Sequence, residues 1–293
     1  MTGSAVQQLE ALARSDGVVA PLALLQAEAL RATADLSWEE GVPALSRQRV
    51  LDGLVLLHGQ TLRVSVERAE RLLARLAGVA EETGHPEAGA LRKAVDRHAV
   101  DVPSLLVAGI VQDGAALHAM AEGLGIGPGP FASLAQQLVL PILQACGRKA
   151  TPLLADAPWE AGYCPVCAAW PTLAEVRGLE RRRWLRCGRC GASWPFPHQR
   201  CAFCGNADHR TLGYLAPEAD RESRRVETCD RCLGYLKSVS SVGPLTPGEV
   251  LLRDLATLEL DMAALEREYA PPSAPGFPLE VRVEARRRGL LWW

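Results

Sequence analysis

Apolar positions recur at helical spacing through the first half of the chain. The clearest example is residues 62–83, where apolar side chains three or four positions apart form one face and charged side chains lie off it. Gly84 and Pro86 then favour an end to that helix. Other segments with helical spacing lie at residues 6–13, 21–36, 87–99, 103–123 and 131–149. We therefore expect residues 1–155 to form a helical domain.

The pattern changes after a linker at residues 151–162, which contains two prolines and a glycine. Short strand-like runs then alternate with turns, and they lie at residues 172–176, 183–187, 193–196, 211–215, 225–228 and 235–239. A helical pattern returns at residues 246–269, and the tail from Pro271 is proline-rich and expected to be poorly ordered. These patterns predict an α+β chain with a helical domain (1–155), two tandem modules (156–197 and 198–245), a closing helix (246–270) and a flexible tail (271–293).

Eight of the nine cysteines form four Cys-x-x-Cys pairs within the strand-rich segment. The pairs are Cys164/Cys167, Cys187/Cys190, Cys201/Cys204 and Cys229/Cys232. Each such turn places two sulfurs on one side of a tight loop, and two turns can provide the four thiolates of a tetrahedral metal site. Four pairs therefore predict two metal ions, each bound by four cysteines.

The intervals between the pairs indicate how they combine. Nineteen residues separate the first pair from the second, and 24 separate the third from the fourth. Each interval is long enough for a β-hairpin that returns to the same metal. Only ten residues separate the second pair from the third, which suits a crossing between modules. The predicted metal sites are Cys164, Cys167, Cys187 and Cys190 for the first, and Cys201, Cys204, Cys229 and Cys232 for the second. Each would make its module rubredoxin-like or zinc-ribbon-like.

Glycines support the predicted turns. Gly191 and Gly205 directly follow the second cysteine of their pairs, where a positive φ lets backbone N–H groups point at sulfur, and Gly188 fits the same need inside its pair. Four thiolates suit zinc and a single iron ion alike, so these residues leave the metal open. They also leave open whether the metals only hold the fold or carry electrons, as in rubredoxin-like proteins.

Charge and targeting signals indicate where the protein is located and which partners its charge favours. Residues 1–10 show no secretory signal, and no run of about 18 uncharged apolar residues suggests a membrane span. We therefore expect a cytoplasmic protein, in which reduced thiols favour metal binding over disulfides. The net charge is -2, but residues 164–240 hold thirteen lysines and arginines against eight acidic residues. A nucleic-acid-binding zinc ribbon is thus an alternative, although a solvated basic surface is the commoner explanation.

Catalytic patterns are not visible in the sequence. It shows no nucleophile–base pair and no carboxylate pair at a catalytic spacing, and a closed four-thiolate site leaves no position for a substrate. The glycine-rich stretch from Gly123 lacks the Gly-Lys-Ser/Thr of a phosphate loop and fits an inter-helix linker. We expect no catalytic turnover.

The cysteine blocks resemble those of a known family. They are Tyr163-Cys-Pro-Val-Cys167, Trp184-Leu-Arg-Cys187 with Cys190, Arg200-Cys201 with Cys204-Gly205, and Glu227-Thr-Cys-Asp-Arg-Cys232 followed by Gly234-Tyr-Leu-Lys237. These blocks resemble the FdhE-type formate dehydrogenase accessory proteins, over about residues 20–270 of this chain. All eight cysteines match the family motif, whereas Ala168 stands where the family usually has glycine.

The resemblance implies a cytoplasmic accessory protein, or chaperone, for the maturation of respiratory formate dehydrogenase. The implied partner is the catalytic molybdenum- or tungsten-containing subunit, bound before its folded export by the twin-arginine route. Rubredoxin-like metal sites in such proteins favour iron over zinc. A redox or electron-transfer role within that maturation is an alternative.

Overall fold

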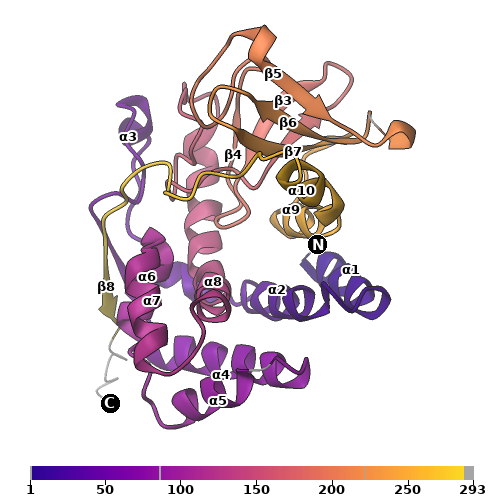
Figure 1. Cartoon of the computed structure of the whole chain (residues 1–293). Helices are drawn as coiled ribbons and strands as arrows, with labels where there is room; N and C mark the ends of the chain where they lie inside the picture. The colour runs from indigo at the N-terminus through magenta and orange to yellow at the C-terminus, as the bar shows by residue number, and fades with distance from the viewer. Residues whose placement is uncertain (1, 86, 221, 287–293) are drawn as a thin grey trace. The chain divides into compact units, whose positions relative to one another are not determined.

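The chain divides into two compact units. The computed structural model describes residues 2–85, 87–220 and 222–286, and Figure 1 traces their helices and strands. A cysteine-rich unit holds residues 46–56 and 150–279, and a helical unit holds residues 2–45, 57–149 and 280–286. The predicted boundary near residue 155 lies close to this division. Segment 46–56, however, joins the cysteine-rich unit, although the sequence places it in the helical domain.

Amphipathic helices build the helical unit. They are α1 (Thr2–Ser15), α2 (Ala20–Ala32), the 3-10 helix η1 (Leu36–Gly41), α4 (Val66–Glu82), α5 (Ala88–Asp96), α6 (Val102–Val111), α7 (Gly114–Gly123) and most of α8 (Pro128–Leu154). In α4, the Ser65 side chain accepts a hydrogen bond from the Arg68 backbone N–H and so caps the N-terminus. Leu72, Leu73 and Leu76 are buried on one face of α4, as their spacing predicts.

A two-stranded parallel sheet, absent from the sequence-based prediction, completes the helical unit. Strand β1 (Gln60–Val64) pairs with β8 (Val281–Ala285), with Gln60 beside Val281. Leu62 is fully buried in β1, so its apolar side chain belongs to a strand and the predicted helix begins only at Val66. In Figure 1, β8 runs beside α6.

The tail from Pro271 differs from the poorly ordered segment that its composition predicts. It contains strand β8, and beyond that strand the Arg286 backbone N–H donates to the Val64 carbonyl, 2.8 Å away. The Arg286 side chain forms an ion pair with Glu40. Residues 287–293, with Trp292 and Trp293, lie outside the described residues.

A six-stranded sheet forms the centre of the cysteine-rich unit, in the order β4-β3-β2-β7-β6-β5. Its strands are β2 (Leu173–Arg177), β3 (Arg182–Arg186), β4 (Ser193–Pro195), β5 (Leu212–Leu215), β6 (Arg224–Cys229) and β7 (Gly234–Ser241). All six predicted strands are therefore present. Strands β2 and β7 pair in parallel, with Ala174 opposite Ser238, and so join the two predicted modules into one sheet. Shorter elements of this unit are α3 (Arg47–Leu51), η2 (His209–Thr211) and η3 (Glu218–Asp220).

The predicted closing helix is two helices, α9 (Pro247–Leu255) and α10 (Leu258–Leu265). Thr246 and Glu249 form a capping box at the start of α9. At its end, the Thr257 hydroxyl donates to the Arg253 carbonyl, 2.8 Å away, where the first helix stops. Helix α10 lies against β6 and β7 (Figure 1), and Val250 of α9 packs in a separate buried cluster with Leu173 of β2 and Val239 of β7. The buried cluster between α10 and the sheet contains Val226, Tyr235, Leu260 and Ala264. The α+β class predicted from the sequence is thus confirmed.

Glu175 in β2 is a buried carboxylate that ties the sheet together. Arg177 and Ser241 donate hydrogen bonds to it at 2.8 and 2.6 Å, Arg186 forms an ion pair with it, and the Leu245 N–H donates at 2.9 Å. Burial raises the pKa of Glu175, but these hydrogen bonds and the charge of Arg186 outweigh it and lower the pKa to about 2. Glu175 therefore remains ionised while it links β2, β3, β7 and the segment before α9.

Each helix in residues 2–85, 87–220 and 222–286 is too short or too polar to cross a bilayer.

Candidate metal centres

The structure gathers the eight cysteines of the four pairs into the two predicted groups. Site 1 is Cys164, Cys167, Cys187 and Cys190, and site 2 is Cys201, Cys204, Cys229 and Cys232; in each, the four Sγ atoms lie within 4.8 Å of one another. The shortest Sγ–Sγ distances are 3.4 and 3.5 Å in site 1 and 3.7 Å twice in site 2. Four sulfurs bound to one metal at about 2.3 Å lie about 3.8 Å apart, whereas a disulfide bond is about 2.05 Å long. The spacing fits a shared metal ion.

All four Cys-x-x-Cys turns share one backbone conformation. The residue directly after the second cysteine has a positive φ in each: 62° at Ala168, 77° at Gly191, 70° at Gly205 and 54° at Leu233. In the first three turns, the N–H of this residue donates to the carbonyl of the first cysteine at 3.0–3.1 Å. The glycine prediction therefore holds at Gly191 and Gly205, and Ala168 adopts the same conformation despite its side chain.

Gly188 does not share the positive φ that the sequence predicts for it. Instead, a Cβ at this position would lie 2.5 Å from Thr172 Oγ1. The Gly188 N–H donates to that same oxygen at 2.9 Å. Glycine is thus required here for close approach to Thr172.

N–H groups point at the sulfurs of both sites. Val166 and Phe203 lie inside the first and third pairs, and the backbone N–H of each donates to the sulfur of the first cysteine of its own pair at 3.4 Å. In site 2, the Asn206 side-chain amide also donates to Cys229 Sγ at 3.6 Å and to Thr211 Oγ1 at 2.7 Å. Sequence reasoning missed Asn206, although its place just after Gly205, beside the third pair, was a usable signal. These donors stabilise negative charge on sulfur.

Burial in site 1 requires a cation if all four sulfurs are to be thiolates. Burial raises the pKa of Cys164 and Cys190, whereas hydrogen bonds from the neighbouring thiols hold the pKa of Cys187 well below its usual value. Desolvation penalises each negative charge, and a metal ion removes that penalty. The residues present therefore fit a four-thiolate metal. Zinc would crosslink the two turns, and iron would in addition exchange an electron.

The two sites differ in exposure. In site 1 all four cysteines are buried, with at most 2% of any of them exposed. In site 2, Cys201 and Cys229 are buried, but Cys204 and Cys232 are exposed. Aromatic residues help to cover site 1: Tyr163 packs against Phe277 and Trp170, with ring centroids 5.8 and 6.2 Å apart. Site 1 is closed to solvent, and site 2 is open along one edge.

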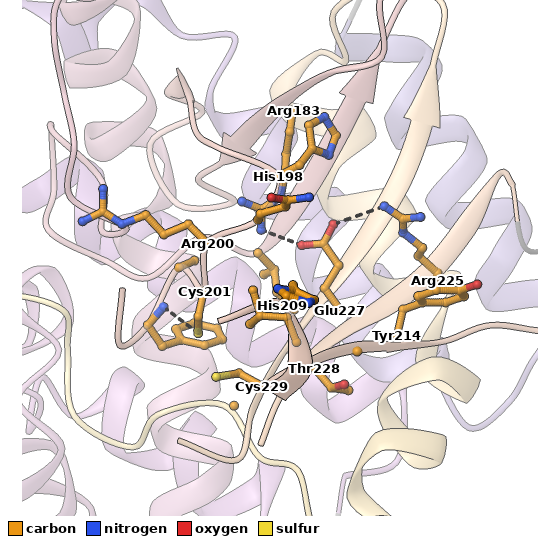
Figure 2. Close-up of a pocket in the computed structure, with 17 residues that line it drawn as sticks. Arg183, His198, Arg200, Cys201, His209, Tyr214, Arg225, Glu227, Thr228 and Cys229 are labelled. Carbon is orange, nitrogen blue, oxygen red and sulfur yellow. Dashed lines mark hydrogen bonds and ion pairs between the residues drawn. The ribbon is translucent and has the colours of Figure 1, made fainter. Parts of the chain in front are cut away.

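A pocket of about 270 Å³ lies beside site 2, and Cys201 and Cys229 form part of its wall. Its charged and polar lining, drawn in Figure 2, includes Arg183, His198, Arg200, His209, Arg225 and Glu227. Three arginines and one carboxylate thus line the pocket, which gives it an excess of positive charge.

Glu227 lies between two of these arginines (Figure 2). It accepts a hydrogen bond from Arg183 at 2.5 Å, and its other oxygen lies 3.8 Å from Arg225. Arg200 instead lies over the Phe196 ring, 5.7 Å from its centroid. The carboxylate therefore offsets Arg183 most closely.

Several basic residues counted in residues 164–240 are held in ion pairs. Arg183, Arg186 and Lys237 are buried and bonded to carboxylates. Arg182 and Arg210 are exposed but pair with neighbouring acidic residues. These five side chains do not form the open cationic face that nucleic-acid binding would need.

Known proteins share sequence similarity with the part of the chain that contains site 2. The family described as "FdhE, C-terminal domain" matches residues 199–275, which contain site 2, α9 and α10. A protein named FdhE homolog from Aquifex aeolicus is 29% identical over 116 residues, covering 38% of this chain and 40% of that protein. The FdhE homolog of Stutzerimonas stutzeri is 34% identical over 110 residues, covering 36% of this chain and 35% of that protein. The matches thus span about two fifths or less of these curated relatives.

A solved structure extends the likeness to most of the chain. The crystal structure of the FdhE protein from Pseudomonas aeruginosa matches with a TM-score of 0.55 and 20% identity, and the match covers 94% of each chain. At this identity the match establishes the fold. The resemblance inferred from the cysteine blocks is confirmed.

Proposed function

We propose, from the match of residues 199–275 to the FdhE C-terminal domain, that this chain is an accessory protein in the maturation of formate dehydrogenase. The matched segment carries the fourth cysteine pair and the residues after it, Gly234 to Lys237. The fold similarity over 94% of the chain adds support, because it extends beyond the matched domain.

In this proposal the partner is the catalytic subunit of formate dehydrogenase. The chain binds it in the cytoplasm before export and performs no catalytic turnover of its own. The closed four-thiolate geometry supports the second point, because such a site keeps no coordination position for a substrate.

The eight clustered cysteines bind two metal ions, iron or zinc, in the same proposal. The sulfur spacing and the N–H donors directed at sulfur support it. An absorption spectrum of anaerobically purified protein, with elemental analysis, separates the metals: ferric thiolate sites are coloured, and zinc sites are colourless. A colourless chain with about two zinc ions removes the redox alternative.

Deletion in the native host tests the accessory function. Formate oxidation in membranes should fall when the gene is deleted and return when it is restored. Cys229→Ser should not restore it, whereas Cys146→Ala should, because Cys146 lies in α8 outside both sites. A tagged chain should also co-purify with the catalytic subunit. Unchanged formate oxidation after deletion would rule out the proposal.

A further inference from the structure

We propose that site 2 is an exchangeable metal site that releases its ion to an anionic thiolate ligand, whereas site 1 retains its ion. The inference rests on the proposed metal binding by the eight cysteines. It gives the two sites different tasks: site 1 holds the fold, and site 2 passes a metal to a thiolate acceptor.

Exposure is the first argument. Metal–thiolate exchange requires an incoming ligand to reach the ion while a cysteine moves away. Cys204 and Cys232 are exposed and border solvent, so they have room to move. In site 1, Cys164, Cys167 and Cys187 have no exposed surface at all, and an incoming ligand has no approach without local unfolding.

The surroundings of site 1 strengthen this contrast. Segment 274–277 lies over its first turn: Trp170 donates to the Ala274 carbonyl at 2.8 Å, and Gly276 approaches Tyr163 so closely that a Cβ would lie 2.4 Å from Tyr163 Cβ. From the other side, the Pro165 carbonyl accepts the Leu56 N–H at 2.8 Å. Segments distant in sequence thus enclose site 1.

Charge indicates the class of ligand. The pocket walled partly by Cys201 and Cys229 contains Arg200 and Arg225, and its single carboxylate is bonded most closely to Arg183. The resulting positive field raises the local concentration of anions. Soft metals held by thiolates prefer another thiolate as the incoming donor.

The exchange balances without any redox partner. The incoming thiolate forms one metal–sulfur bond as one cysteine thiolate leaves and takes a proton from solvent. Repetition by a dithiol removes the ion, and the metal keeps its oxidation state throughout.

Competition with two dithiols tests the proposal on the full chain loaded with two zinc ions. Zinc that remains on the chain is measured after rapid gel filtration. Dimercaptosuccinate, which is anionic, should remove one ion at least tenfold faster than the other. If both ions leave at one rate, the proposal is overturned. A chain that never binds two ions would instead contradict the proposed metal sites.

Alkylation assigns the fast ion without any substitution. The zinc-loaded chain is treated with N-ethylmaleimide, and modified cysteines are identified by mass spectrometry. Cys204 and Cys232 should be modified as the first ion leaves, and the four cysteines of site 1 should be modified only later. Early modification of Cys164 or Cys187 overturns the assignment.

Charge variants test the role of the pocket. Arg200→Gln and Arg225→Gln should slow release to dimercaptosuccinate severalfold and leave release to neutral dimercaptopropanol unchanged. Arg210→Gln is the matched control, because Arg210 lies in the same module but outside the pocket wall, and it should change neither rate. Equal effects on both dithiols would contradict the anion preference.

Discussion

Trp170 and Phe203 meet edge to face, with ring centroids 5.3 Å apart and ring planes at 82°. Phe203 lies between Cys201 and Cys204 of site 2, and Trp170 follows the first cysteine pair of site 1. Gly234 makes room for this contact, because a Cβ there would lie 2.7 Å from the Phe203 ring. The two metal modules therefore contact each other through side chains as well as through the β2–β7 pairing.

Phe203→Ala should weaken the contact between the modules. The loss of this half-buried ring and its aromatic partner should lower the free energy of unfolding of the cysteine-rich unit by about 2 kcal/mol. Urea denaturation of the metal-loaded chain measures it. Leu179→Ala is the control, because Leu179 is fully exposed, and it should have no measurable effect. Equal stability of Phe203→Ala and the unsubstituted chain would contradict a role for the aromatic pair.

Ala168→Gly should stabilise the first cysteine turn. Ala168 has a φ of 62°, and this left-handed conformation costs a non-glycine residue about 1–2 kcal/mol. Removal of its buried methyl group offsets about 0.8 kcal/mol, so urea denaturation should show a net gain of about 0.2–1.2 kcal/mol. Ala169→Gly is the matched control: Ala169 is also buried but lacks a positive φ, and glycine there should destabilise. Destabilisation by both substitutions would show that Ala168 is not strained.

The stabilising contribution of Glu175 should be lost in acid. Its pKa falls from 4.5 to about 2 on folding, so its contribution is fully present above pH 4.5 and is lost as the pH falls through about 2. This shift corresponds to a contribution on the order of 3 kcal/mol. Glu175→Gln lacks it, so the difference in unfolding free energy between the two chains should shrink from pH 5 to pH 2.

Acid also affects the cysteines of the metal sites. Glu175→Gln and the unsubstituted chain carry the same cysteines, so this effect cancels in the difference between their unfolding free energies. Glu180→Gln is the control, because Glu180 is exposed and pairs with exposed Arg182. It should follow the unsubstituted chain at every pH. A constant gap between Glu175→Gln and the unsubstituted chain would mean that Glu175 titrates alike in the folded and unfolded states.

Metal removal should unfold the metal modules but leave the helical unit folded. A metal bound by four cysteines would join two turns in each module, so it would contribute much of the stability of the modules. After chelation under reducing conditions, hydrogen exchange should accelerate across β2–β3 and β5–β7, and it should remain slow across α4 and α6. Unchanged exchange in the strands would show that the sheet is stable without metal.

Local signals were sufficient for most of the candidate site. The spacing of the cysteine pairs predicted both groups of four, and turn signals placed all six strands of the sheet. Those features depend on residues no more than 31 positions apart. The positive φ at Leu233 was not predicted, because no glycine marks it.

Distant pairings could not be predicted from one sequence. The β2–β7 ladder, the β1–β8 ladder and the Glu175 network each join residues more than 60 positions apart. The pattern of Leu62 and Val64 fits either a strand or the start of a helix, and only the arrival of β8 decides between them. The same limit applied to the pocket beside site 2, whose arginines come from separate strands and turns.

The pairing of β1 with β8 also sets an order of events during synthesis. Strand β1 emerges from the ribosome about 220 residues before its partner, so it must wait, unpaired, while both cysteine modules are translated. All eight cysteines of the two candidate metal sites are translated during that interval. The helical unit can therefore be completed only after residues up to at least Ala285 have been made.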